Sequence, residues 1–212
     1  MQRFTTKQAL METFGRPDGS LRDADLSFIH IAGVDLAGMN LAGVNFSGGV
    51  LSDVNLDGCD LTGAHVVESQ FSRVTMRKAC LSHALFQRVE MDQCTLEGAD
   101  ATEASFFIST MPRVDFRGAV LVKAQLLQTN LDQADFTGAD LSHAQMRESS
   151  LEATRFISCD LSGVDFRKAN FHHAEYQHVC TDDALYYGKP PWGGETIPGR
   201  DWVRDLPVFD GE

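Results

Sequence analysis

Residues 134–144 of the chain are ADFTGADLSHA, and residues 164–171 are VDFRKANF. In both stretches a large apolar residue recurs at every fifth position, and a small residue stands two positions before it. The spacing continues outward in both directions without an insertion or a deletion. Of the 33 positions sampled in steps of five from Leu26 to Tyr186, 31 are large and apolar. This uniform period decides the fold.

A five-residue period fits neither regular element, because an α-helix repeats its buried face every 3.6 residues and a strand repeats it every 2. A chain that turns by about 90° per five residues instead places both the large and the small positions inside a square coil. Each coil then takes about 20 residues, and adjacent coils are spaced like neighbouring strands, about 4.8 Å apart. The sequence therefore predicts about eight coils in a rod about 40 Å long.

Glycine recurs two positions after the large residue, where a square coil has its corners. A tight turn often needs a positive φ angle, which glycine adopts without steric cost. We therefore expect corners at eleven glycines: Gly33, Gly38, Gly43, Gly48, Gly58, Gly63, Gly98, Gly118, Gly138, Gly163 and Gly188.

Several of the five-residue units resemble the A(D/N)LXX motif of the pentapeptide repeat family, among them Ala134–Gly138, Ala139–His143 and Val164–Lys168. The resemblance covers about 165 of the 212 residues. It implies an all-β fold, a right-handed quadrilateral β-helix. It does not imply an activity, because members of this family serve many roles and a fold does not determine a function.

The N-terminal end differs in kind from the repeats. Residues 1–21 are expected to form a cap that covers the apolar end of the first coil, since solenoids need caps. Within it we expect a short helix over residues 5–14, with Thr5 or Thr6 as the N-cap and Gly15 at its end.

The repeats are expected to occupy residues 22–187, and residues 188–212 to form an irregular tail rich in proline, glycine and tryptophan. In one interpretation the tail folds over the last coil, with Trp192 and Trp202 as lids. In the other it is a docking peptide for a partner.

The composition is typical of a soluble rod, with 43% hydrophobic residues, 23% charged residues and a net charge of −12. No stretch approaches the 18 or more apolar residues of a membrane span. The N-terminus lacks the apolar core of a secretory signal. We therefore expect a cytoplasmic protein without a membrane partner.

The five cysteines can be placed by their phase in the repeat. Cys59, Cys94 and Cys159 fall at small inward positions and should be buried thiols. Cys80 and Cys180 fall at outward positions on one face, five coils or about 24 Å apart, whereas a disulfide needs Cα atoms within about 7 Å. The pattern suits a reducing compartment.

The sequence gives little sign of catalysis or of a bound cofactor. One cluster combines metal-ligating residue types, but its members fall on successive faces of a square rod and should not converge: His172, His173, Glu175, His178 and Cys180. No phosphate-binding loop, nucleophile elbow or zinc-type cysteine pair occurs in the sequence. We expect no enzyme activity, no metal site and no cofactor.

Residues 20 apart stack in columns if four units close each coil, so the outer surface can be sorted by face. We call the acidic face the outward residues beside Leu41, Leu61, Leu81, Leu121, Leu141 and Leu161. The candidate partner-binding residues on it are Asp60, Asp100, Glu103, Asp140 and Asp160.

The apolar face comprises the outward residues beside Phe46, Val66, Phe86, Phe106, Leu126 and Met146. Its candidate partner-binding residues are Val67, Leu85, Phe107, Ile108 and Leu127. Clustered exposed apolar groups usually mark an interface. Phe107, Ile108 and Leu127 fall on adjacent coils and should touch.

These surfaces favour a non-catalytic protein-interaction module that binds a protein of unknown identity through the apolar face, the acidic face or both. A homodimer through the apolar face is one form that such an interaction could take. A second alternative, implied by the resemblance, is an adaptor or immunity-type protein of a bacterial secretion or toxin system.

A further alternative implied by the resemblance is a DNA-mimicking modulator of DNA gyrase or another topoisomerase. Duplex DNA carries one charge per about 1.7 Å, hence roughly 24 charges over a 40 Å rod. Residues 22–186 hold 23 acidic residues and 12 Lys or Arg, a net charge of −11. The mimicry would thus be about half as strong as DNA itself. Direct binding of nucleic acid is not expected, because the sequence has no basic stripe.

Overall fold

The computed structural model describes residues 3–187 and 189–193. One helix, α1 (Lys7–Phe14), stands near the N-terminus. The strands are β1 (Arg3–Phe4), β2 (His30–Ala32), β3 (Val50–Ser52), β4 (Gln70–Ser72), β5 (Glu90–Asp92), β6 (Arg155–Ile157) and β7 (Glu175–Gln177). None of the helices in this part of the chain is long and apolar enough to cross a bilayer.

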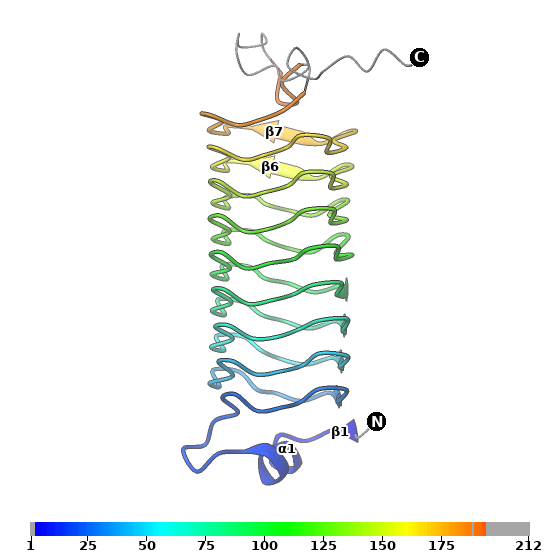
Figure 1. The fold of residues 1–212 in the computed structure, drawn as a ribbon, viewed down its shortest axis with the longest axis vertical. Coiled ribbons are helices and arrows are strands. Elements are labelled where there is room, and N and C mark those ends of the chain that lie inside the picture. Colours follow the sequence, from blue (N-terminus) through cyan, green and yellow to red (C-terminus); the bar gives the residue numbers. More distant parts are fainter. Residues whose placement is uncertain (1–2, 188, 194–212) are drawn as a thin grey trace, which may run out of the picture.

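Every strand pairing is parallel, and between successive coils it joins residues 20 positions apart. β2, β3, β4 and β5 form consecutive rungs of one sheet, with Ile31 opposite Leu51 and Leu51 opposite Phe71. The same register continues in isolated bridges from Asp25–Asn45 to Asp165–Leu185. The chain therefore winds as a right-handed quadrilateral β-helix, which appears in Figure 1 as an upright stack of coils. This confirms the predicted fold.

Each corner of the coil brings a residue into the left-handed region of backbone space. Gly118 has a φ of 63°, and the other predicted corner glycines within the described residues also have positive φ, whereas Gly188 lies outside them. Of the described residues, twenty-three other than glycine adopt the same conformation, among them Ile108 with a φ of 57°. A left-handed conformation costs about 1–2 kcal/mol for such a residue. The hydrogen-bonded coil therefore imposes the corner even where the sequence resists it.

The large inward residues fill the interior in stacked columns. Phe116, Phe136, Phe156 and Tyr176 stack face to face, with ring centroids 4.9, 5.4 and 5.1 Å apart. Ala101, one of the two positions that break the large series, is buried like its neighbours. An alanine in place of a large residue therefore does not change which positions point inward.

Small polar residues inside the coil find partners in the backbone. The Thr129 hydroxyl donates to the carbonyl oxygen of Phe106 at 2.8 Å, and the Ser109 hydroxyl donates to that of Phe86, also at 2.8 Å. These bonds satisfy polar groups that would be costly to bury alone. They explain why Ser and Thr alternate with Ala, Val and Cys at the inward small position.

In many units Asp or Asn precedes the large residue, and it has a structural role that the sequence analysis did not anticipate. Asp140 accepts a hydrogen bond through Oδ1 from the backbone N–H of Ser142 at 2.9 Å. Asn130 does the same for the N–H of Asp132, also at 2.9 Å. Such side-chain bonds imitate a backbone turn. Asp and Asn are therefore interchangeable for the turn, although only Asp adds charge.

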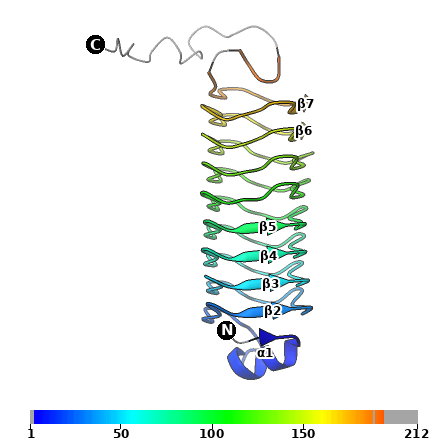
Figure 2. The ribbon, with the colours of Figure 1, turned by 90° about the vertical axis from the view of Figure 1, so that its right-hand side faces the viewer.

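The N-terminal helix confirms the predicted cap. The Thr6 hydroxyl accepts from the N–H of Ala9 at 3.2 Å, and the N–H of Gly15 donates to Met11 O at 2.8 Å. β1 was not predicted: it pairs in parallel with β2 and extends the sheet below the first coil. Figure 2 shows β2 to β5 facing the viewer, with α1 below them.

At the C-terminal end, Trp192 packs over the last coil. Its ring lies 5.2 Å from that of Tyr186, 6.2 Å from that of Tyr176 and 6.3 Å from that of Phe166. This is the position predicted for a lid. The second predicted lid, Trp202, lies outside the described residues.

The register predicts how the five cysteines react. Burial raises the pKa of Cys59, Cys94 and Cys159 to about 11, whereas Cys180 is exposed and Cys80 half-buried. Because the thiolate is the reactive species, a disulfide reagent at pH 8 should label Cys180 first and Cys80 more slowly. The other three thiols should react only in denaturant, as measured by mass spectrometry.

The control is Cys180→Ser, which should remove the fast phase and leave the denatured count lower by one thiol. Rapid labelling of Cys94 in the native protein would show that the inward register is wrong.

Candidate interaction surfaces

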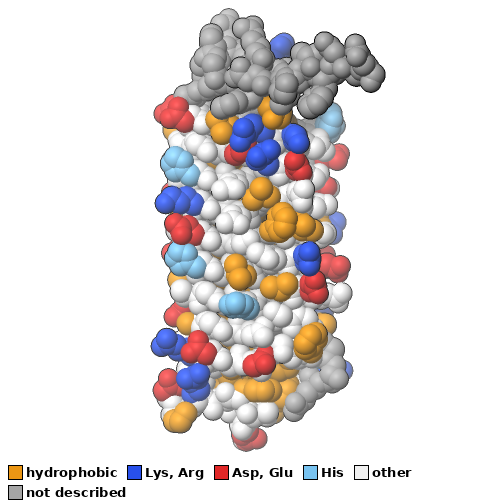
Figure 3. All heavy atoms as spheres, viewed as in Figure 1, with side chains coloured by type: hydrophobic (Ala, Val, Ile, Leu, Met, Phe, Trp, Pro, Cys, Tyr) orange, Lys and Arg blue, Asp and Glu red, His pale blue; other side chains and the backbone are white. Residues whose placement is uncertain are grey.

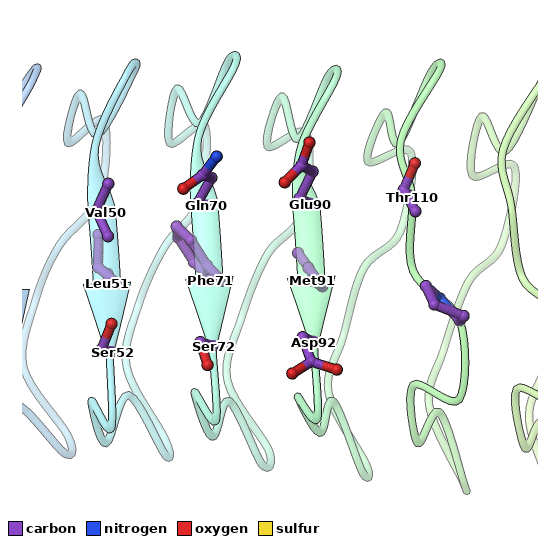
Figure 4. A pocket seen from close by; sticks show the side chains of 11 residues that line it. Val50, Leu51, Ser52, Gln70, Phe71, Ser72, Glu90, Met91, Asp92 and Thr110 are labelled. Atoms are coloured by element: carbon purple, nitrogen blue, oxygen red, sulfur yellow. The ribbon is translucent and has the colours of Figure 1, made fainter.

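A shallow channel of about 380 Å³ runs across β3, β4 and β5. Figure 4 shows three rows of side chains along it. Gln70, Glu90 and Thr110 lie in one outer row, and Ser72 and Asp92 lie in the other. The row between them is apolar and consists of Leu51, Phe71 and Met91. Over the part of the chain that the structure describes, no three His, Cys, Asp or Glu side chains are grouped to hold a metal ion.

Four predicted residues of the acidic face lie in a single column. Parallel bridges join Asp60 to Cys80, Cys80 to Asp100, Asp100 to Val120, Val120 to Asp140, and Asp140 to Asp160. Cys80 and Val120 thus interrupt the acidic residues at two levels. The carboxylates of the column are spaced by one or two coils, about 4.8 or 9.6 Å.

Each of these four carboxylates uses one oxygen for the turn. The Oδ1 atoms accept backbone N–H groups at 2.9–3.0 Å: Thr62 for Asp60, Thr102 for Asp100, Ser142 for Asp140 and Ser162 for Asp160. Among the described residues, none of the four Asp side chains has a Lys, Arg or His partner within 4 Å. The column therefore presents uncompensated negative charge.

The environment of Asp100 keeps this charge in place at neutral pH. Partial burial acts to raise the pKa of Asp100, but hydrogen bonds from the Thr102 hydroxyl and N–H and from Ser82 outweigh burial and leave the pKa below its usual value. Hydrogen bonds to the ionised form of a carboxyl group favour that form. Asp100 is thus a fixed anion.

Glu103 differs from the other predicted acidic residues. It stands at the corner of the acidic face, 3.5 Å from the Lys123 ammonium and 3.3 Å from Nδ1 of His83. Its charge is therefore compensated by its own column. The sequence analysis also missed Val120, which is 37% exposed in the acidic column. Its signal in the sequence is an apolar residue in a column whose other members are mostly Asp or Asn.

The face that carries β6 and β7 balances its own charges. Arg77 lies 3.5 Å from both Asp57 and Glu97, and Arg117 lies 3.7 Å from Glu97 and 2.7 Å from Asp115. Acidic and basic residues thus alternate along the rod. Exposed pairs of this kind contribute little to stability, but they leave this face with little net field.

The apolar face brings its predicted residues together over neighbouring coils. The N–H of Ile108 donates to the carbonyl oxygen of Leu127 at 3.1 Å, which places Phe107 and Ile108 directly beside Leu127. Ile108 is 40% exposed, and Val67, Leu85, Phe107 and Leu127 are half-buried. Figure 3, seen from the side of this face, shows hydrophobic side chains between groups of acidic and basic ones.

The sequence analysis missed the most exposed large apolar residue of the described chain. Phe28 is 69% exposed and occupies the same corner column as Ile108, four coils or about 19 Å away. Its ring lies against the backbone of Gly48, where an added Cβ would come within 2.5 Å of it. The signal was an aromatic residue at a corner position that elsewhere favours glycine.

Charged pairs flank the apolar residues in this corner column. Glu68 and Arg88 form an ion pair at 3.0 Å on one side, and Glu148 and Lys168 form one at 3.2 Å on the other. The apolar face is therefore bordered by charge of both signs, in contrast to the acidic face.

Comparison with known proteins found a matching family model and solved structures of similar fold. A family model for pentapeptide repeats matches in eight copies, over residues 20–58, 50–88, 79–106, 109–138 and 144–175. No protein of curated function matches the sequence.

Two solved structures share the architecture. One is HetL, a pentapeptide repeat protein involved in heterocyst differentiation regulation from the cyanobacterium Nostoc sp. strain PCC 7120, with a TM-score of 0.62 and 20% identity over 87% of this chain and 85% of HetL. Trypsin-treated QnrB1, a plasmid-mediated fluoroquinolone resistance protein, has a TM-score of 0.52 and 20% identity over 75% of this chain and 82% of QnrB1. At such identities the likeness concerns the fold alone. The repeats, their register and the family match together show that this chain belongs to the pentapeptide repeat family.

Proposed function

We propose that this chain is a non-catalytic protein-interaction module that binds a protein partner through its apolar face, beside the charged column of the acidic face. The observation that carries the proposal is the strained and exposed conformation of Ile108. This β-branched residue has a φ of 57°, and it is 40% exposed. A β-branched residue at positive φ is a genuine outlier.

Folding offers no reason for Ile108. Gly118 adopts the same corner conformation without strain, and an added Cβ there would meet nothing within 4 Å. Ile108 contributes no inward packing that would offset its strain, because the corner points away from the core. An exposed apolar side chain held in a costly conformation, next to Phe107 and Leu127, is accounted for by contact with another molecule.

The distribution of charge over the faces supports the apolar face as the binding surface. The charges on the face of β6 and β7 are paired within the chain, as in Arg77 with Asp57 and Glu97. The apolar face instead combines an apolar centre with a polar border, as specific protein interfaces do. The uncompensated Asp residues of the acidic face would add steering of a basic partner rather than most of the affinity.

Phe107→Asp is expected to weaken binding of a partner isolated from the native host by at least about tenfold, because it places a charge in an apolar contact. Ile157→Asp is the matched control: Ile157 is also half-buried and outward, but it lies in β6 on the face with paired charges. The measurement is capture on immobilised protein, followed by titration with the purified partner. Equal losses for both variants, or none for Phe107→Asp, would refute the assignment.

A second candidate, modulation of DNA gyrase by DNA mimicry, is favoured by the uncompensated column of the acidic face. Purified protein would inhibit or protect gyrase in a supercoiling assay. Asp→Asn at Asp60, Asp100, Asp140 and Asp160 removes four charges yet keeps an Oδ1 acceptor for each turn, as Asn130 does. The effect on gyrase should fall by at least about tenfold, because interaction with a DNA-binding surface depends on charge.

The control removes four charges elsewhere in the rod. The same turn bond is accepted by Asp35, Asp115, Asp135 and Asp165 in their own units. Asp→Asn at these four positions removes the same amount of charge but leaves the acidic column intact. The DNA-mimicry candidate fails if wild-type protein leaves supercoiling unchanged, or if the two quadruple variants behave alike.

A further inference from the structure

The corner column of the apolar face has an ordered arrangement of charge. From the N-terminal side, and at successive coils, it presents Glu68, Arg88, Ile108, Gln128, Glu148 and Lys168. The acidic member of each ion pair is the N-terminal one, with Glu68–Arg88 at 3.0 Å and Glu148–Lys168 at 3.2 Å. The four charged side chains are 37–64% exposed. The column thus has one ion pair on each side of an apolar centre, and both pairs run from acidic to basic toward the C-terminal end.

We infer that the partner of the apolar face is a second copy of this chain, bound antiparallel about a two-fold axis that crosses the face between the coils of Phe107 and Leu127. The inference rests on the proposed function, since it names the occupant of the same surface. A two-fold axis of this kind keeps each column opposite itself and reverses its direction. The charges of the column, taken from the N-terminal side, therefore face the same charges of the second copy in the opposite order.

In this register the charges are complementary at every level of the corner column. Glu68 faces Lys168 of the second copy, and Arg88 faces Glu148 of the second copy. The two-fold axis repeats both contacts, so two squares of alternating charge form, one at each side of the centre. Opposite charges across an interface fix its register and suppress other pairings.

The apolar residues meet at the centre. Phe107 faces Leu127 of the second copy, and Ile108 lies beside Gln128 and Leu127 of the second copy. The contact covers the apolar cluster that is exposed in the single chain. Burial of this cluster on association would stabilise the dimer. It also gives the strained corner at Ile108 a partner.

The remaining charges of the face do not oppose the contact. Arg147 and Arg167 would face Gln87 and Val67 of the second copy, and both lie near Asp165 of their own chain, at 3.9 and 2.7 Å. Arg167 binds Asp165 through two parallel hydrogen bonds of 2.8 and 2.7 Å. Between the described residues of these two columns, no like charges face one another across this register.

The two neighbouring registers fail on charge. Sliding one copy by a single coil, about 4.8 Å, brings Glu68 opposite Glu148 in one direction and Arg88 opposite Lys168 in the other. Both clashes occur twice because of the two-fold symmetry. A parallel dimer with its two-fold axis along this corner column would set every charge of the column against itself. The sequence of the column therefore favours the antiparallel arrangement about the Phe107–Leu127 level over its neighbouring registers.

The contact is small. From Glu68 to Lys168 the column spans five coil steps, about 24 Å. A strip of this length on a narrow rod lies below the roughly 800 Å² per partner of standard interfaces. The dimer should therefore form with a dissociation constant on the order of micromolar.

Sedimentation equilibrium of the full chain over a roughly hundredfold concentration range tests the inference. Wild type should shift from monomer to dimer as concentration rises. Arg88→Glu and Glu148→Arg should each raise the dissociation constant of the homodimer by at least about tenfold, because each sets like charges against one another. Arg113→Glu is the matched control, since Arg113 is a corner residue of similar exposure on another face, and it should dimerise as wild type does.

Mixing the two defective variants is the decisive step. In a mixed dimer the glutamate introduced at position 88 would face the arginine introduced at position 148 at one site. At the other site the original Arg88 and Glu148 would face each other. Recovery of a heterodimer with wild-type affinity would support the register, since effects within either chain cannot produce it. A chain that stays monomeric, a dimer indifferent to Arg88→Glu, or variants that fail to recover on mixing would each overturn it.

The result is separable from the proposed function. A monomeric chain that still captures another protein in a Phe107-dependent manner would overturn the dimer and leave the interaction module intact. A dimer with the predicted charge dependence would support the inference even if no other protein were captured.

Discussion

The parallel hydrogen-bond ladder between coils is the constraint on which the rest of the structure depends. The N–H of Leu121 donates to Asp140 O at 2.7 Å, and the N–H of Asp140 donates to Ala119 O at 3.0 Å. Similar bonds recur at every fifth residue, so each residue is held above the one that is 20 positions earlier. Inward and outward positions follow from this register, and so do the columns of the surface. Even the strained corner at Ile108 is held by its bond to Leu127.

The interior repeats the same two kinds of position throughout, so the faces of this rod differ from one another in their outward columns. The ion pairs around Arg77 neutralise one face, Asp60 and Asp140 leave another negative, and Phe107 and Ile108 make a third apolar. A rigid scaffold presents such features at fixed spacings of about 4.8 Å. Family membership alone does not specify a function, and we propose that the function of this protein depends on what each column carries.

The period of the sequence was enough to predict the interior and the faces. The burial of Phe136 and Cys94, the corner at Gly118 and the common column of Asp60 and Asp140 all follow from counting in fives and twenties. The pairing of β1 with β2 does not follow, because two residues are too few to show a period. The ion pair between Glu103 and Lys123 and the turn bond of Asp140 depend on side-chain conformation, which a repeat pattern does not encode.

The most direct test of the 20-residue register is disulfide formation between engineered cysteines, in a background with Cys80 and Cys180 replaced by serine. Gln133→Cys with Ala153→Cys joins corners of adjacent coils, and a disulfide needs Cα atoms within about 7 Å. Gln133→Cys with Ser158→Cys places the second cysteine at the next corner of the square. The first pair should oxidise to completion and the second should remain reduced. Equal oxidation of both pairs, or oxidation of the second alone, would contradict the square coil.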